Sequence, residues 1–237
     1  MAVINECRET KRLQELRDSN TCYPSVKLFI AADIPQSIVP CLKKLQNTLA
    51  NAVSVYPVLQ YTPQEICHIT LAYFGEQDMQ KLEQIVEFCH NLQQKCKSHI
   101  FTAHFHKSVL KFFGSTISQE KRHTHSLRRG AAIAITLQSN LSEIAQVLTQ
   151  EWKDLLQKQA AKTFTPHLTI GRIRIVKQKS REKHEHASAL DALDKLVAGI
   201  SVQIPNFTIP SFTLFESQGN GNYVPLYTCV LPNLLPN

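Results

Sequence analysis

Two short apolar segments of this chain each contain a histidine followed, two residues later, by a threonine. The first pair is His68 and Thr70, and the second pair is His167 and Thr169. The flanking residues have the apolar character of β-strands, in which side chains two residues apart lie on the same face, roughly 6.5–7 Å from each other. Each segment is therefore expected to present an imidazole and a hydroxyl on one face and apolar side chains on the other.

A single His-x-Thr pattern is common by chance, but two copies 99 residues apart indicate two related halves that face a shared cleft. Free histidine titrates near ~6.5, so two imidazoles at one small site suit acid–base chemistry close to neutral pH. One neutral ring can accept a proton from water, while the other, protonated, can donate a proton to a leaving oxygen. The threonine hydroxyls can donate hydrogen bonds to an oxyanion between the rings.

An arginine and a tyrosine lie close to these pairs. Arg172 follows Thr169 by three residues, so an ideal strand would place it on the opposite face. The intervening Gly171 could carry a β-bulge that turns the guanidinium inward, where it would form charge-assisted hydrogen bonds to a phosphate. Tyr73 lies just beyond the first pair and is a candidate for stacking on a nucleobase, whereas its neighbour Phe74 is expected in the core.

At these residues the sequence resembles the 2H phosphoesterases, and most of all their LigT-like branch of RNA 2′,3′-cyclic phosphodiesterases, also called 2′-5′ RNA ligases. The segment His68–Gly75 is similar to the first HxTx motif of that family, and Pro166–Arg172 is similar to the second, arginine included. The likeness extends to Lys27–Pro35, which resembles the opening strand of the family, and to Phe212–Tyr223, which resembles its closing hairpin.

The resemblance implies an α+β fold with two pseudo-symmetric lobes, each an antiparallel-rich sheet with helices on its outer face, and a central cleft. It implies metal-independent hydrolysis of RNA 2′,3′-cyclic phosphate ends to 2′-phosphomonoesters, with no cofactor. On family precedent, His167 accepts the proton from water and His68 donates one to the leaving 3′ oxygen. Thr70, Thr169 and Arg172 would bind the phosphate. The residues alone do not assign which histidine is the acid, because the two motifs are nearly equivalent.

Other functions remain open on the same residues. A 2′,5′-oligoadenylate phosphodiesterase or another cyclic nucleotide phosphodiesterase would use the same scaffold, and the reverse reaction, 2′-5′ ligation of RNA, would use the same site. From a different class, a non-catalytic module that binds RNA ends would also present these side chains. His104 and His106 are two apart in an expected strand, but no further ligand lies at metal-binding spacing, so no metal site is expected.

Composition narrows the setting of the protein. The chain has 237 residues, 43% of them apolar, a formal charge of +7 and a pI near 9.0. This charge favours an anionic partner such as RNA ends or small nucleotides. Two basic loops, at residues 121–129 and 172–183, are candidates for contact with an RNA backbone. The seven cysteines contain no Cys-x-x-Cys pair, and neither a signal segment nor a membrane span is evident, so a cytoplasmic monomer with reduced thiols is expected.

Hydrophobic periodicity predicts strands and helices that alternate along the chain. Residues 1–25 are expected to form an N-terminal extension, a short helix or tail anchored by Leu13 and Leu16, and residues 26–237 a single bilobal domain. The expected strands are 26–32, 56–61, 64–73, 101–113, 131–137, 165–176, 201–204, 207–215 and 223–231. The expected helices are 37–52, 78–97, 139–160 and 189–198.

Overall fold

A computed structural model describes most of the chain, namely residues 7–18, 25–52, 59–96, 98–105, 110–113, 132–156, 164–173, 197, 199–219 and 221–231. Both basic loops lie outside the described residues except for Arg172 and Ile173, and His106 lies outside them as well. The same holds for nearly all of the helix that was predicted at residues 189–198.

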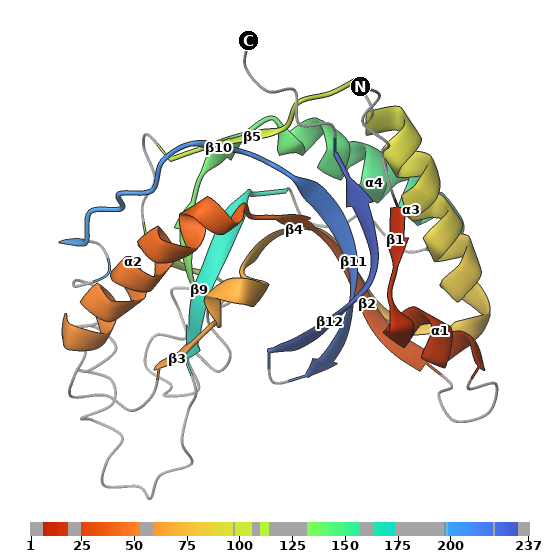
Figure 1. The fold of residues 1–237 in the computed structure, drawn as a ribbon, viewed down its shortest axis with the longest axis horizontal. Coiled ribbons are helices and arrows are strands. Elements are labelled where there is room, and N and C mark those ends of the chain that lie inside the picture. Colours follow the sequence, from red (N-terminus) through yellow and green to blue (C-terminus); the bar gives the residue numbers. More distant parts are fainter. Residues whose placement is uncertain are drawn as a thin grey trace, which may run out of the picture.

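Within the described residues, nine strands form one curved antiparallel sheet (Figure 1). Its order is β1-β12-β11-β2-β4-β9-β7-β6, and β3 pairs with β9 off this path. The strands are β1 (Cys7–Glu9), β2 (Ser25–Asp33), β3 (Leu59–Tyr61), β4 (His68–Asp78), β6 (Leu110–Phe113), β7 (Ala132–Thr136), β9 (His167–Ile173), β11 (Ser211–Gly219) and β12 (Asn222–Val230). A small second sheet has the order β10 (Phe207–Thr208), β5 (Thr102–His104), β8 (Gln138–Ser139).

Helices lie along the outer, convex side of the curved sheet (Figure 1). They are α1 (Lys11–Asp18), α2 (Val39–Ala52), α3 (Leu82–Cys96) and α4 (Leu141–Leu156), with short 3₁₀ turns at Gln36–Ile38, Gln64–Ile66 and Met79–Lys81. Their buried residues recur at helical spacing, as in α3, where Leu82, Ile85, Val86, Cys89 and Leu92 face the core. The resemblance implied outer helices on antiparallel sheets, and the structure has them. The strands of the two halves, expected as two sheets, join in one sheet through the pairing of β4 with β9.

The two faces of β2 pack against different layers. Every second residue of the strand, beginning at Leu28, is fully buried in the main core beneath the helices. Phe29 and Ala31 point to the other, concave side and form a smaller cluster with Phe215, against which Tyr223 packs. This burial on both sides explains why the sequence of β2 is an uninterrupted apolar run rather than an alternating one.

Helices from one half of the molecule cover strands of the other half. α2 follows β2 in the chain, yet its Gln46 side chain donates to the backbone oxygen of Ile170 in β9 at 2.9 Å and to that of Thr62, beside β3, at 2.7 Å. α4 follows β7 and contacts β4. The buried apolar residues of both halves therefore form one continuous core cluster.

Among the predicted strands, two are divided, one is absent, and the one expected at residues 64–73 begins with the 3₁₀ turn Gln64–Ile66. The strand expected at residues 101–113 is two strands, β5 and β6, which belong to different sheets. Alternation of apolar residues marks strand character but does not specify the partner strand, and here the backbone NH of Phe105 bonds to the side chain of Asn206. Residues 201–204 form no strand, and the strand expected at residues 207–215 is divided into β10 and β11 at Pro210, which lacks a backbone NH.

Residues 7–18 pack onto the edge of the sheet. Strand β1 pairs with β12, so that Cys7 lies opposite Cys229. Leu13 and Leu16 of α1 are almost completely buried, which confirms both as anchors. Arg12 forms a bidentate ion pair with the largely buried Glu216 of β11, in which Nε and Nη2 donate to the carboxylate oxygens at 2.8 and 3.1 Å. Strand β1 was not predicted, and the boundary at residue 25 stays a prediction.

Candidate active site

The two His-x-Thr segments lie on neighbouring strands at the centre of the sheet. β4 and β9 are antiparallel, and Ile69 pairs with Leu168. Both of these residues are fully buried in the core, so the motif residues on either side of them face the concave surface. Extending this register by one residue in each direction places His68 opposite Thr169, and it places Thr70 opposite His167.

Each of these strands contains an extra residue just beyond its threonine. In β9, Gly171 and Thr169 pair with consecutive residues of β7, so Ile170 is the extra residue of a bulge. In β4, Ala72 and Thr70 pair with consecutive residues of β2, so Leu71 is the extra one. Both extra residues are buried in the core. The bulge shifts the alternation by one, and this turns the following side chains back toward the cleft.

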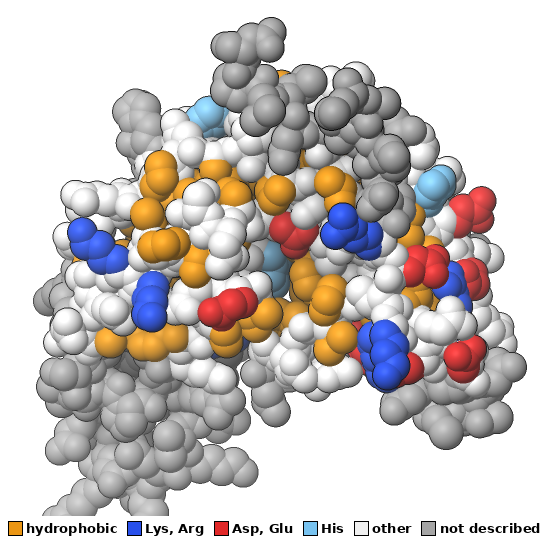
Figure 2. Space-filling view, viewed as in Figure 1, with side chains coloured by type: hydrophobic (Ala, Val, Ile, Leu, Met, Phe, Trp, Pro, Cys, Tyr) orange, Lys and Arg blue, Asp and Glu red, His pale blue; other side chains and the backbone are white. Residues whose placement is uncertain are grey.

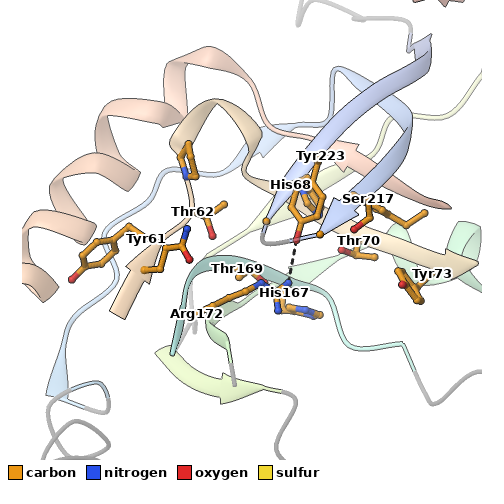
Figure 3. A pocket seen from close by; sticks show the side chains of 15 residues that line it. Tyr61, Thr62, His68, Thr70, Tyr73, His167, Thr169, Arg172, Ser217 and Tyr223 are labelled. Atoms are coloured by element: carbon orange, nitrogen blue, oxygen red, sulfur yellow. Dashed lines mark hydrogen bonds between the residues drawn. The ribbon is translucent and has the colours of Figure 1, made fainter. Parts of the chain in front are cut away.

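The four motif residues line a single pocket of about 530 Å³ on the concave side of the sheet. In the space-filling view it appears as a hollow near the centre of the face, with histidine surface inside it (Figure 2). Tyr73 and Arg172, the two residues beyond the bulges, line it as well (Figure 3). The structure therefore brings together all six of the site residues named from the sequence. Arg172 reaches the pocket through the extra residue at Ile170 rather than at Gly171.

Other residues of the pocket were not found from the sequence. They are Phe29, Gln60, Tyr61, Thr62, Pro63, Ser217, Gly219, Gly221 and Tyr223. Phe29, Ser217 and Tyr223 lie in the opening strand and closing hairpin that resembled the family, so a signal for them was present. Residues 60–63 reach the pocket because β3 pairs with β9, and no local sequence pattern predicts that pairing.

Both histidines are held in the same way. The Nδ1 atom of His68 lies 2.8 Å from the backbone oxygen of Ile66, and the Nδ1 atom of His167 lies 2.8 Å from that of Thr165. A carbonyl oxygen only accepts, so the proton of each neutral ring sits on Nδ1. The lone pair of each neutral ring is then on Nε2. In each half the carbonyl belongs to the residue two positions before the histidine, and this repeats the pseudo-symmetry of the halves at atomic detail.

His68 lies among aromatic rings. Its imidazole packs on Phe29 and Phe215 at centroid distances of 5.0 and 5.7 Å, and Tyr223 meets it edge-on at 5.2 Å. The loss of hydration in this setting lowers the pKa of His68 from its ordinary 6.5 to about 4. The backbone oxygen of Ile66 opposes this pKa shift, while the positive charges of Arg172 and His167 add to it. His68 is therefore neutral at pH 7 when no anion is bound.

A partly buried carboxyl group lies next to His68 in the sheet. Asp33 of β2 pairs with His68 in register, and its Oδ2 atom accepts hydrogen bonds from Ser211 and Thr213 of β11, both at 2.6 Å. Burial raises the pKa of Asp33, and the two hydroxyl groups oppose that shift. These hydrogen bonds link β2 to β11 beside the aromatic rings that surround His68.

Several sequence expectations concern metals, thiols and membranes. Cys41, Cys67, Cys89, Cys96 and Cys229 are free thiols. Among the described residues, no group of three or more histidine, cysteine or acidic side chains is placed to hold a metal ion, and the exposed His104 contacts the Thr102 hydroxyl at 2.9 Å. None of the helices described has both the length and the apolar character needed to span a bilayer.

The described charged side chains on the face shown in Figure 2 do not gather into one patch. Lysine and arginine side chains are spread over that face and alternate with acidic ones (Figure 2). The two basic loops proposed to contact RNA lie outside the described residues apart from Arg172 and Ile173, so that role stays a prediction.

The curved antiparallel sheet, its outer helices and the paired His-x-Thr strands agree with the resemblance to the 2H phosphoesterases, and the predicted fold is confirmed. The chain belongs to the 2′-5′ RNA ligase superfamily, whose sequence model matches residues 59–209. It is similar to the RNA 2′,3′-cyclic phosphodiesterase of Methanocaldococcus jannaschii, with 26% identity over 158 residues that span 67% of this chain and 78% of that protein.

Solved structures show the same fold. The TT0787 protein of Thermus thermophilus matches with a TM-score of 0.59 and 18% identity, over 86% of this chain and 97% of its own. LigT of E. coli in complex with 3′-AMP matches with a TM-score of 0.51 and 17% identity, over 88% of this chain and 99% of its own. LigT in complex with NADP⁺ matches with a TM-score of 0.51 and 18% identity, over 89% and 100%.

Proposed function

We propose that this protein hydrolyses the 2′,3′-cyclic phosphate ends of RNA to 2′-phosphomonoesters, with two histidines as acid and base and without a metal ion. The observation that carries the proposal is the matched pair of His68 and His167, which face one cleft from adjacent strands with the same carbonyl tether on Nδ1. The Methanocaldococcus jannaschii relative is named for this reaction, and LigT has been solved with a nucleotide bound, which supports the substrate class.

In this mechanism each of the two rings exchanges a proton through its Nε2 atom. His167 accepts a proton from a water molecule, whose oxygen attacks phosphorus. The bond between phosphorus and the 3′ oxygen breaks, and His68 donates a proton to that oxygen. Steps of this kind commonly contribute ~10²–10⁴-fold each. Thr70 and Thr169 donate hydrogen bonds to the phosphoryl oxygens, and Arg172 offsets their charge.

The assignment of His68 as the acid requires that it be protonated when substrate is bound. In the unliganded protein its pKa is about 4, and Arg172 and His167 both add to that lowering. A bound phosphate places negative charge among these groups and favours the imidazolium form, which raises the pKa of His68. The substrate thus promotes protonation of its own acid catalyst.

The two ends of the cleft suit a nucleotide. Tyr73 lies at one end and Tyr61 at the other, with the histidines and Arg172 between them (Figure 3). Tyr73 is 64% exposed, which is unusual for so large an apolar ring. We assign Tyr73 as the stacking platform for the terminal base, because a stacked base would shield this exposed ring from solvent.

The test is a turnover assay on a short RNA that ends in a 2′,3′-cyclic phosphate, with EDTA present and the product identified by phosphorus NMR. The expected product is the 2′-phosphomonoester, at a rate that EDTA does not change. A 3′-monophosphate would overturn the regiochemistry, and loss of activity in EDTA would overturn the metal-free mechanism. Binding without turnover would identify an RNA-end binding module. Faster turnover of 2′,5′-oligoadenylate than of the cyclic-phosphate RNA would identify a 2′,5′-oligoadenylate phosphodiesterase.

The expected setting of the enzyme is the cytoplasm, as a monomer. The free thiols support a reducing compartment, because disulfides form and persist in oxidising ones. Sedimentation equilibrium tests the monomer, and fractionation of cells that express a tagged chain tests the compartment.

A further inference from the structure

Tyr223 connects the two halves of the pocket. It lies near the start of β12, just beyond the turn that contains Gly219 and Gly221, and it lines the pocket. The edge of its ring packs against His68 at 5.2 Å. Its hydroxyl oxygen lies 3.3 Å from the Nη2 atom of Arg172 (Figure 3). One side chain therefore contacts the proposed acid of the first half and the proposed phosphate ligand of the second.

The direction of the hydrogen bond leaves the tyrosine proton available. A guanidinium group has donors only, so Arg172 donates and the hydroxyl oxygen of Tyr223 accepts. The proton of that hydroxyl must then point elsewhere, and within the described part of the chain it meets no acceptor. A hydroxyl that accepts from a cation is also a stronger donor, because successive hydrogen bonds polarise one another.

We propose that Tyr223 contacts the substrate and donates a hydrogen bond to a phosphoryl oxygen held between His68 and Arg172, an inference that rests on the proposed function. Phosphate oxygens are acceptors that make several bonds each, and the donors already named come from β4 and β9 alone. Tyr223 adds one from the closing hairpin, on the side of the pocket where the ring of His68 is packed. Its aromatic ring has a separate role, which is to keep water from His68.

The first experiment separates the hydroxyl from the ring. Tyr223→Phe keeps the ring against His68 and removes only the donor. The affinity for adenosine 2′-monophosphate, measured by calorimetry, should fall about 10–100-fold, the usual effect of losing a hydrogen bond to a charged group, and kcat/KM on the cyclic-phosphate RNA should fall at least as much. The midpoints of the pH–rate profile should not move, because the aromatic rings around His68 are intact.

Tyr227→Phe is the matched control. Tyr227 lies on the same strand, and its hydroxyl contacts Nδ1 of His90 at 3.2 Å, outside the residues that line the pocket. The same atom is removed from a hydrogen-bonded tyrosine, so any general effect on β12 should appear in this variant too. We expect affinity and kcat/KM within about twofold of the wild type. Equal losses in the two variants, or no loss in Tyr223→Phe, would overturn the proposal.

A double-mutant cycle separates direct donation from an effect through Arg172. If Tyr223 only positions the guanidinium, then Tyr223→Phe should have no effect in an Arg172→Gln background. Direct donation predicts that a several-fold loss of nucleotide affinity persists there, and its absence would overturn the proposal. A wild type that binds adenosine 2′-monophosphate but leaves the RNA intact would overturn the proposed function, and the binding comparison would still decide on Tyr223. A wild type that does not bind the nucleotide would overturn both.

Discussion

Tyr73 of β4 and Arg172 of β9 occupy equivalent positions in the two halves of the molecule. Each follows its threonine by three residues, each lies beyond one buried extra residue, and each lines the pocket. The backbones of the two halves thus repeat, while the side chains at this position differ in chemistry. The half with the tyrosine suits an aromatic base, and the half with the arginine suits a phosphate.

Replacing Tyr73 should affect binding more than catalysis. Base stacking is typically worth ~1–3 kcal/mol, and it is made in the ground state and the transition state alike. Tyr73→Ala should therefore raise KM for the cyclic-phosphate RNA by about 5–100-fold and leave kcat nearly unchanged. Steady-state kinetics measure this, with Val147→Ala, a change to an exposed apolar residue of α4, as the control. A fall in kcat at constant KM would contradict the stacking role.

Removing either imidazole should abolish most turnover. His68→Ala and His167→Ala should each lower kcat by ~10²–10⁴-fold, because each removes one proton-transfer group. His104→Ala is the matched control, since His104 is exposed on β5 in the other sheet and should retain full activity. Single-turnover assays on the cyclic-phosphate RNA decide the matter. Near-normal turnover in either pocket variant would contradict the two-histidine mechanism.

The low pKa of His68 makes stability depend on pH. Its pKa is 6.5 in the unfolded chain and about 4 in the folded protein, so the unfolded chain binds more protons between these values. The contribution of the neutral ring to the free energy of unfolding is fully present above about pH 6.5 and decreases as the pH falls toward 4.

Urea denaturation of the wild type and His68→Phe across this range measures that contribution. The stability difference, wild type minus variant, should become less favourable to the wild type between about pH 6.5 and 4. The raised pKa of Asp33 acts in the opposite sense, but Asp33 is present in both proteins and its effect should largely cancel. A difference that does not change with pH would mean that His68 is not desolvated.

Ligand binding should raise the pKa of His68. A phosphomonoester bound beside Arg172 adds negative charge close to the ring and stabilises its protonated form. NMR titration of the imidazole should give a midpoint near 4 without ligand and a clearly higher one with adenosine 2′-monophosphate. A midpoint that does not move on saturation would show that His68 is not adjacent to the bound phosphate.

The N-terminal residues should contribute to global stability. Leu13 is fully buried, and Leu13→Ala should lower the free energy of unfolding by about 2–4 kcal/mol through lost burial and the cavity left behind. Gln14→Ala, a change to an exposed neighbour on the same helix, should have an effect within about 0.5 kcal/mol. Urea unfolding curves measure both. Equal effects would show that residues 7–18 are not part of the cooperative unit.

Local pattern predicted the part of the site that is local. Alternation in a strand is enough to place His68 with Thr70, because no partner strand needs to be known. The position of the bulge at Ile170 was not predictable in the same way, because it is defined by the register of β9 against β7. The side chain of Arg172 could thus be expected in the pocket, but not the residue that turns it there.

Non-local pairing explains the remaining errors. Strand β1 has only three residues and takes its register from β12, at the far end of the chain. Tyr61 enters the pocket because β3 pairs with β9, and the split of residues 101–113 follows from two different partner strands. Each of these features depends on which strand is the pairing partner, and a single sequence does not predict the partner.

The exchange of helices between the halves limits how this protein can be divided. α2 covers strand β9, and α4 covers strand β4, so neither half encloses an apolar interior without the other. A chain cleaved between α3 and β5 would yield two fragments, and each would lack the helix that covers its own motif strand. Such fragments should fold only when mixed, as complementing partners.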